Sequence, residues 1–549
     1  MPIAYVYRLL KGWTAAADQR AVDYPRWIGQ RVRERRREYP LPPRGRRPSF
    51  EVLTLVYNTD PAILRETAQS VLAQDYPDFR WVVWDNGSDR LDTRDLLWQL
   101  QADARVVVRR SDWNLGITRG HREALRFCSA DYVALLDHDD RLYPDALRIA
   151  ACVLDRHRRP PLLYSDEDKI DAAGTPFCPF FKPDWSPALL QSTGYTCHLT
   201  VFRRDLAGPL GLFSDPRVEG AQDWDVALRF LDARYVGVHV PEVLYSWRVL
   251  PESTAARGAA AKPYVLAGQR ACLEAALARR RLGEAFRIVP NPLFPAVDGH
   301  WRLERVRAEL PPVEVVIGPG PGEEGDAPAA VLNRLVAEST SPFFACIPPG
   351  VVRLAPRWLH EAITQLELNP DAALVGGRVL DRHDRVVAGP LTLGLGGLVG
   401  TAGAGGPGDD IGYFGLSLSP RNVSAVCRVP WVARRELLAE WGFDEQAFPE
   451  HYAEVDLCLR LLAAGRQVIY SPHIVGWVSA EALHRDPAAE EAEAARLVER
   501  HGTRLADDPY YSPRAALRPE HAYQPASAAE RQAALRALVP PAAGRRLSA

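Results

Sequence analysis

Hydrophobic and polar positions follow two alternating periods in the first half of the chain. Short apolar runs typical of buried strands occupy 52–57, 80–84, 105–108, 132–136 and 162–164. Stretches with the apolar spacing of helices lie between them, at 61–74, about 93–101, 117–127 and 144–156. Because strands and helices alternate, the pattern predicts βαβ units on a mostly parallel sheet with flanking helices, an α/β fold.

Polar clusters follow four of these predicted strands. They occupy residues 57–60, 85–89, 137–140 and 165–168. In open α/β sheets, ligands bind beyond the carboxyl ends of the strands. We therefore expect the four clusters to face one crevice.

The 137–140 cluster has the composition of a cation site. Asp137 and Asp139 place carboxylate oxygens directly after an apolar strand. Mg²⁺ and Mn²⁺ prefer such ligands and complete their shells with water and substrate phosphates. A surface turn whose aspartates cap the next helix is the alternative interpretation, and the polar ends of the other strands favour the metal site.

Asp223 is the candidate general base. It lies near the predicted start of a helix, where first-turn amides can hold a carboxylate that points into a cleft. A plain helix cap is the alternative. His198 and His121 are candidates for lining the same crevice, with a purely structural histidine as the alternative for each.

The chain repeats itself at an offset of 231 positions. Matched positions include 203–206 with 434–437, Gly211 with Gly442, Asp223 with Glu454, and Pro241 with Pro472. The second copy is shorter at its front, since Tyr57 to Asp137 spans 80 positions whereas Ile317 to Pro348 spans 31. Its strand ends in Pro348-Pro-Gly instead of an acidic cluster. We predict a truncated second α/β domain without the metal site.

A chain of 549 residues exceeds the size of a single hydrophobic core, so several domains are expected. We predict a helical, arginine-rich leader and linker at 1–48 and a first α/β domain at 49–290. A degenerate second domain follows at 291–515, with a C-terminal tail at 516–549.

Charge and composition limit the partners and the location. With 67 basic and 69 acidic residues, the net charge of -2 argues against a nucleic-acid binder. The arginine run 31–47 has two interpretations, contact with anionic lipid headgroups at the inner membrane surface or a solvated face, and the second is favoured.

Eight scattered cysteines without a C-x-x-C pair suit a reducing cytosol. No secretion signal is visible, and the uncharged stretch 386–408 is too rich in glycine for a membrane span. We predict a cytoplasmic protein, with peripheral contact at the membrane face as the alternative.

In chain order, the motifs resemble those of the family 2 glycosyltransferases of GT-A fold. The match over about 50–250 rests on Val56-Tyr-Asn, Trp84-Asp-Asn-Gly-Ser-Asp, Asn114-Leu-Gly-Ile, Leu135-Leu-Asp-His-Asp-Asp, Tyr164-Ser-Asp-Glu-Asp-Lys, Phe181-Lys-Pro-Asp-Trp-Ser-Pro and Gln222-Asp-Trp-Asp. The nearest resemblance is to bacterial enzymes that build O-antigen and other surface polysaccharides. The second half resembles a degenerate tandem copy, through Glu454-Val-Asp-Leu and Asp508-Pro-Tyr-Tyr.

The resemblance implies a Rossmann-like GT-A catalytic domain at 49–290. It also implies an inverting, Mg²⁺- or Mn²⁺-dependent transfer of a hexosyl or deoxyhexosyl group from a nucleotide-diphosphate sugar. The acceptor would be a hydroxyl of a glycan or lipid-linked glycan, in the biosynthesis of O-antigen lipopolysaccharide, capsule or a similar polymer.

The resemblance also implies residue roles. Asp137 and Asp139 would hold the metal, and Asp223 would deprotonate the acceptor. The predicted substrate-binding side chains are Tyr57, Asp85, Asn86, Asp137 and His198.

Two departures from the family pattern leave a second function open. The family often has a second aspartate at position 86 and a histidine at position 246, where this chain has Asn86 and Ser246. A non-catalytic scaffold in a polysaccharide-assembly complex is therefore the alternative hypothesis. A nucleotidylyltransferase is disfavoured, because 57–61 is not the glycine-rich basic loop that such an enzyme would need.

Overall fold

The computed structural model describes residues 23–250, 264–295, 297–319, 326–479 and 487–536. The chain forms two compact units. The first comprises the described residues of Met1–Trp185, Thr193–Gly283 and Ala296–Trp301, and the second those of Ser186–Ser192, Glu284–Pro295 and Arg302–Ala549. Apart from the short segments 186–192 and 296–301, the boundary therefore lies near residue 283.

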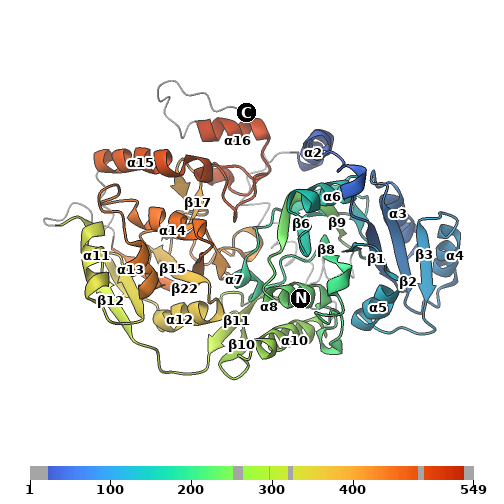
Figure 1. Cartoon of the computed structure of the whole chain (residues 1–549), viewed down its shortest axis with the longest axis horizontal. Helices are drawn as coiled ribbons and strands as arrows, with labels where there is room; N and C mark the ends of the chain where they lie inside the picture. The colour runs from blue at the N-terminus through green and yellow to red at the C-terminus, as the bar shows by residue number, and fades with distance from the viewer. Residues whose placement is uncertain (1–22, 251–263, 296, 320–325, 480–486, 537–549) are drawn as a thin grey trace. The chain divides into compact units, whose positions relative to one another are not determined.

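A nine-stranded sheet forms the centre of the first unit (Figure 1), with the order β3-β2-β1-β4-β8-β6-β9-β5 and β7 paired to β6. Its first four members run parallel: β1 (Phe50–Val56), β2 (Phe79–Asp85), β3 (Val106–Arg110) and β4 (Tyr132–Leu135). The others are β5 (Arg141–Leu142), β6 (Leu162–Ile170), β7 (Pro176–Phe180), β8 (Thr200–Arg203) and β9 (Val238–Arg248). β8 runs antiparallel to both neighbours, and β9 is parallel to β6. The predicted α/β class is confirmed.

Helices flank this sheet, and several begin where the sequence indicates. α3 begins at Pro61, with the Asp60 side chain accepting a hydrogen bond from the amide of Ala62, as expected of an N-cap followed by proline. The helices are α2 (Tyr24–Glu38), α3 (Pro61–Leu72), α4 (Leu91–Leu100), α5 (Ile117–Ala124), α6 (Ala146–Arg156), α8 (Gln222–Asp232) and α10 (Tyr264–Arg279).

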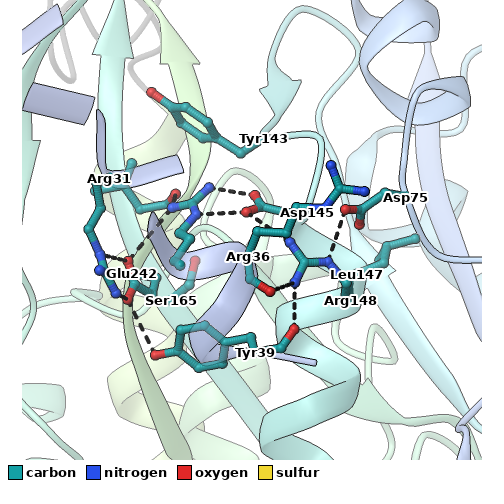
Figure 2. Close-up of polar contacts among 12 residues, drawn as sticks. Arg31, Arg36, Tyr39, Asp75, Tyr143, Asp145, Leu147, Arg148, Ser165 and Glu242 are labelled. Atoms are coloured by element: carbon teal, nitrogen blue, oxygen red, sulfur yellow. Dashed lines mark hydrogen bonds and ion pairs between the residues drawn. The ribbon is translucent and has the colours of Figure 1, made fainter. Parts of the chain in front are cut away.

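The predicted leader is part of the first unit. Helix α2 turns Arg31 and Arg35 inward, and Arg35 is fully buried. Arg35 binds both carboxylate oxygens of Asp145, at 2.8 and 2.5 Å. Arg31 binds both carboxylate oxygens of Glu242 in the same way (Figure 2). The interpretation of the whole arginine run as a solvated face is therefore wrong for these two residues. Buried guanidinium groups are tolerated because each has a carboxylate partner.

The fifth predicted strand is longer than the hydrophobic pattern indicates. β6 continues to Ile170, so that 165–168 lie within the strand and not beyond its end. β6 pairs with β7 over residues 167–170 and with β9 over residues 163–170, so these polar residues belong to the sheet. Asp166 and Asp168 are consequently buried.

The sheet of the second unit has the order β12-β13-β21-β15-β22-β14, with β16 on β15 and β19 on β22. Its strands are β12 (Val313–Ile317), β13 (Phe343–Ile347), β14 (Val351–Leu354), β15 (Ala372–Leu380), β16 (Val386–Ala388), β19 (Arg421–Asn422), β21 (Trp431–Arg434) and β22 (Gln467–Val478). The order and the relative directions reproduce β1-β4-β8-β6-β9-β5 strand for strand. Counterparts of β2 and β3 are absent from this sheet in the described part of the chain, as the short front of the repeat predicts.

Further elements complete the second unit. Short strands occupy part of the glycine-rich stretch 386–408, where β17 (Pro390–Leu393) pairs with β18 (Val399–Gly400) and also with β20 (Ala425–Val426). β10 (Phe286–Pro290) and β11 (Trp301–Arg305) form a separate two-stranded sheet. The helices are α7 (Pro187–Leu190), α11 (Pro328–Glu338), α12 (Trp358–Leu368), α13 (Arg435–Trp441), α14 (Ala453–Ala463), α15 (Pro487–Leu505) and α16 (Ala528–Arg536).

Both predicted ends of the chain are described in part. The tail residues 516–536 belong to the second unit, where the Leu517 carbonyl accepts a hydrogen bond from the Gly396 amide at 2.8 Å. Residues 1–22 of the leader and 537–549 of the tail lie outside the described residues. Among the helices that are described, none has the length and apolar character needed to cross a bilayer.

Candidate active site

Three potential metal ligands meet beyond the carboxyl end of β4. One ligand atom each from Asp137, Asp140 and His198 lies within 4.8 Å of the other two. His198 reaches the group from the segment before β8, and its Nε2 is 3.8 Å from Oδ2 of Asp137. The Asp137 side chain is 53% exposed, whereas Asp140 is buried, so the cluster opens to solvent on the Asp137 side.

Asp140 is held in place by β9. The Tyr245 hydroxyl donates to its Oδ2 at 2.5 Å, and the Arg248 amide donates to its Oδ1 at 2.7 Å. Burial raises the pKa of Asp140 well above its usual range, and the neighbouring Asp139 and Asp137 carboxylates raise it further. A bound cation would relieve this crowding of carboxylates.

Asp139, a predicted metal ligand, is not part of this three-residue group. Its carboxylate lies 3.9 Å from Nδ1 of His138, and its backbone carbonyl accepts a hydrogen bond from Arg248 Nε at 2.7 Å. Asp140 takes the place of Asp139 in the three-residue group, because hydrogen bonds from β9 hold the Asp140 carboxylate near His198. A role for Asp139 as a ligand stays a prediction.

A buried ion pair positions His198. The fully buried Lys182 ammonium is 3.0 Å from Oε2 of Glu167, and it also donates to the backbone carbonyls of Thr196 and His198. Glu167 Oε2 lies 3.3 Å from Nδ1 of His198. Burial alone would lower the pKa of His198, but hydrogen bonding and the charges of Glu167 and Asp137 raise it to about 9. The imidazole is therefore a cation at neutral pH unless a metal ion displaces its proton.

A second buried histidine fixes the adjacent part of β6. His239 lies between two carboxylates, with Nε2 2.8 Å from Asp166 and Nδ1 2.9 Å from Asp184. Its ring also stacks on Tyr164, with the centroids 5.0 Å apart. Burial would lower the pKa of His239, whereas Asp166 and then Asp184 raise it to about 9.

Asp85 and Asn86, two of the predicted substrate-binding residues, are almost completely buried, at 2% and 4% exposure. Asp85 accepts a hydrogen bond from the Ser88 amide at 2.8 Å and pairs with Arg110. Asn86 donates to Asn114 and to the Gly116 carbonyl, and it accepts from Trp84 and Leu115. Both side chains therefore hold the surrounding loops together, and direct contact with a substrate stays a prediction for each.

Two other predicted residues remain accessible. Tyr57, at the end of β1, is 44% exposed. Asp223 is partly exposed in the first turn of α8, where its Oδ1 accepts a hydrogen bond from the Trp224 amide at 2.9 Å. This is the helix-start position that the sequence indicates.

The charges of both Asp223 and the metal-ligand residue Asp137 act on the buried imidazole of His121. Burial lowers its pKa, and among the charges that oppose this effect are those of Asp137, Asp223 and Glu219. The carboxylates of Asp137 and Asp223 are thus close enough to act on one imidazole. Nδ1 of His121 lies 2.9 Å from the Ile117 carbonyl, a contact in which Nδ1 is the donor.

Sequence reasoning gave no role to Lys182, Glu167 or His239, although Lys182 and Glu167 lie in the quoted motifs. A signal was present for Lys182, which is one of only four lysines in a chain with 67 basic residues. At Ser246, the second departure from the family pattern, the hydroxyl donates to Asp168 at 2.6 Å. The histidine of the cluster is instead His198.

The fold and the site together define an α/β domain with a carboxylate cluster at the carboxyl ends of the strands. Residues 51–206 match the model of the family described as "Glycosyl transferase family 2". The first unit therefore contains a family 2 glycosyltransferase domain.

Relatives match a much longer part of the chain. Over 86% of its length the chain is 32% identical to "Uncharacterized protein y4gI" of Sinorhizobium fredii, of which it covers 58%. It is 27% identical, again over 86% of its length, to "O-antigen biosynthesis protein RfbC" of Myxococcus xanthus, of which it covers 40%. The chain thus spans about half the length of these curated relatives.

Among solved structures, TarS 1-349 of S. aureus in complex with UDP-GlcNAc aligns with 43% of this chain and 70% of its own. The TM-score is 0.34 and the sequence identity is 18%.

Proposed function

We propose that the first unit transfers a sugar from a nucleotide-diphosphate sugar to a hydroxyl of a glycan or lipid-linked glycan acceptor. The product would belong to a surface polysaccharide such as O-antigen or capsule. The observation that carries this proposal is the cluster of Asp137, Asp140 and His198 within a family 2 glycosyltransferase domain. The similarity to the O-antigen biosynthesis protein RfbC supports the polysaccharide assignment.

Asp223 acts as the general base in this proposal. Its carboxylate takes the proton of the acceptor hydroxyl while that oxygen forms a bond to the anomeric carbon. The bond from the anomeric carbon to the diphosphate breaks, and its electron pair leaves with the nucleotide. Because one displacement occurs on the face opposite the leaving group, the configuration inverts.

Asp137, Asp140 and His198 would hold Mg²⁺ or Mn²⁺, since their carboxylate and imidazole groups are a fitting donor set. When bound, the cation supplies positive charge that stabilises the leaving diphosphate. Tyr245 and Arg248 keep the Asp140 carboxylate in place, and Lys182 with Glu167 orients His198. The chain thus presents its ligands already positioned.

A thermal-melting panel tests the proposal on the full-length protein. UDP-, GDP- and dTDP-sugars are added with Mn²⁺, with a CMP-sugar as the monophosphate control. A donor at about 100 times its Kd should stabilise the native protein by about 2.7 kcal/mol. One nucleotide should give this shift in a metal-dependent way. No shift with any donor would favour the non-catalytic scaffold.

The ligand assignment is tested by direct Mn²⁺ binding, measured by calorimetry without any sugar nucleotide. Asp140→Asn and His198→Gln should each weaken Mn²⁺ binding, and Asp139→Ala is the neighbouring comparison. Equal weakening by Asp139→Ala would add that residue to the site. Unchanged Mn²⁺ binding in both Asp140→Asn and His198→Gln would contradict the assignment.

We further propose that the second unit has no transferase activity. Pro348 stands where the first unit has Asp137, and at the 231-residue offset Val429 replaces His198. Glu454, the counterpart of Asp223, accepts hydrogen bonds from Trp431 Nε1 and Cys427 Sγ, both at 2.9 Å. The counterpart carboxylate is thus engaged within the protein.

A further inference from the structure

A hollow of about 600 Å³ lies at the carboxyl ends of β15 and β22 in the second unit. Ligand pockets commonly have volumes in this range. The residues that line it include Val352, Arg353, Arg382, Asp384, Trp477 and Val478. None of them has a part in the proposed function.

Arg353 and Trp477 are lining residues of this hollow that contact each other. They face each other across the antiparallel β14–β22 pair, and the Arg353 guanidinium carbon lies 3.7 Å from the centroid of the indole ring. Trp477 is itself held by Asp384, which accepts a hydrogen bond from Nε1 at 2.7 Å. A guanidinium whose carbon lies over an aromatic ring can still use its outer N–H groups to bind both oxygens of a carboxylate or phosphate.

The charge in the hollow favours an anion. In the part of the chain that the structure describes, no carboxylate lies within ion-pair distance of Arg353 or Arg382. Arg382 Nε donates a hydrogen bond to Nε2 of the His383 imidazole, at 3.0 Å. The carboxylate of Asp384 already accepts from the indole. The hollow is thus lined by two arginines and one aspartate, and that aspartate already accepts a hydrogen bond from Trp477.

The position of the hollow corresponds to the active site of the first unit. Arg353 and Trp477 are paired on β14 and β22, as Arg141 and Ser246 are paired on β5 and β9. Because each strand occupies the same place in its sheet, the hollow lies at the equivalent strand ends. The first unit has carboxylates there that suit a cation, whereas the second carries its own positive groups.

We propose that this hollow binds the anionic group of an acidic saccharide, either the carboxylate of a sugar acid or the phosphate of a sugar ester. The Arg353 guanidinium, oriented by Trp477, would bind the two oxygens, and Arg382 would add charge. The exposed Val352 side chain, at 70% exposure, offers apolar contact to a sugar ring. The saccharide part rests on the proposed function, whereas the anion site rests on the geometry of the hollow.

Calorimetry on the full-length protein tests this site with four probes. Trigalacturonate carries carboxylates, glucose 6-phosphate carries a phosphate, maltotriose is neutral, and inorganic phosphate is the free anion. Trigalacturonate or glucose 6-phosphate should bind, with an affinity that falls as salt rises, and maltotriose should not bind. The anionic saccharide that binds more tightly identifies the source. Inorganic phosphate as tight as glucose 6-phosphate, without trigalacturonate binding, would overturn the saccharide assignment.

Variants locate the binding. Arg353→Gln should weaken binding at least about tenfold, because a charge-assisted paired hydrogen bond is lost. Trp477→Phe, which keeps a ring but loses the bond to Asp384, should also weaken it. Arg466→Gln, at an exposed arginine of the same unit outside the hollow, is the matched control.

Two outcomes would overturn the anion site itself. One is no binding of either anionic saccharide at millimolar concentration, and the other is binding that Arg353→Gln and Arg466→Gln affect equally. Donor-induced melting of the first unit is recorded on the same samples. If no anionic saccharide binds to the hollow but the donor still raises the melting temperature, this inference alone is refuted. If an anionic saccharide binds but no donor raises the melting temperature, only the proposed function is refuted.

Discussion

Lys182 and Glu167 form a buried ion pair whose carboxylate also contacts His198. The pair is 3.0 Å long and joins the segment after β7 to the middle of β6. Because the same ammonium binds the backbone carbonyl of His198, it fixes both the main chain and the ring of that residue. The histidine of the proposed metal site is thus positioned by residues that do not belong to the site.

Lys182→Met should destabilise the first unit by about 3–5 kcal/mol, because the buried Glu167 carboxylate loses its ammonium partner. Mn²⁺ binding should weaken as well, since His198 loses its support. Urea unfolding and calorimetry measure the two effects. The double variant Lys182→Met/Glu167→Gln should recover part of the lost stability. If Lys182→Met alone were as stable as the wild-type protein, the stabilising role of the Lys182–Glu167 ion pair would be contradicted.

The stability of the first unit should fall at alkaline pH through His239. The folded pKa is about 9, above the ordinary value of 6.5, because of Asp166 and Asp184. A raised pKa stabilises the folded state fully below pH 6.5, and this contribution is lost as the pH rises through 9. Urea midpoints at pH 6, 7.5 and 9.5 measure the loss. His239→Gln should flatten this dependence, whereas His157→Gln, at an exposed histidine, should leave it unchanged.

Asp223→Asn should lower kcat by about 10²–10⁴-fold, because the amide cannot take the acceptor proton. The donor-induced melting shift should persist, since the change does not touch the metal ligands. Activity is measured by release of the nucleoside diphosphate. Glu454→Gln in the second unit is the matched control with unchanged turnover. A normal kcat in Asp223→Asn would assign the base to another group.

The docking of helix α2 should depend on Arg35. Arg35→Met removes the guanidinium that binds both oxygens of the buried Asp145 carboxylate, which keeps the longer contact with Arg148 at 3.5 Å, and should cost about 3–5 kcal/mol. Arg33→Met, on the exposed face of the same helix, should change the stability by less than about 0.5 kcal/mol. Limited proteolysis of the 23–48 segment together with urea unfolding measures both. Equal stability of the two variants would mean that α2 contributes little to the first unit.

Local structure and the repeat were predictable from sequence. The apolar runs predict β1 and β4, and the spacing with Asp60 and Pro61 predicts the start of α3. Periodicity reports such neighbours because they lie within a few positions along the chain. The 231-residue offset likewise predicts a second sheet without counterparts of β2 and β3, and the strand orders match it.

The membership of the site was decided only by the tertiary structure. Asp137 and His198 are far apart in sequence, and only the insertion of β8 beside β4 brings them together. Asp139 and Asp140 are indistinguishable in the sequence pattern, whereas hydrogen bonds from β9 select Asp140. The inward direction of Arg35 was equally hidden. Sequence by itself determined where strands, helices and polar ends fall. Packing between distant segments decided which polar groups are buried, paired and shared, because burial is tolerated only where a partner arrives from elsewhere in the chain.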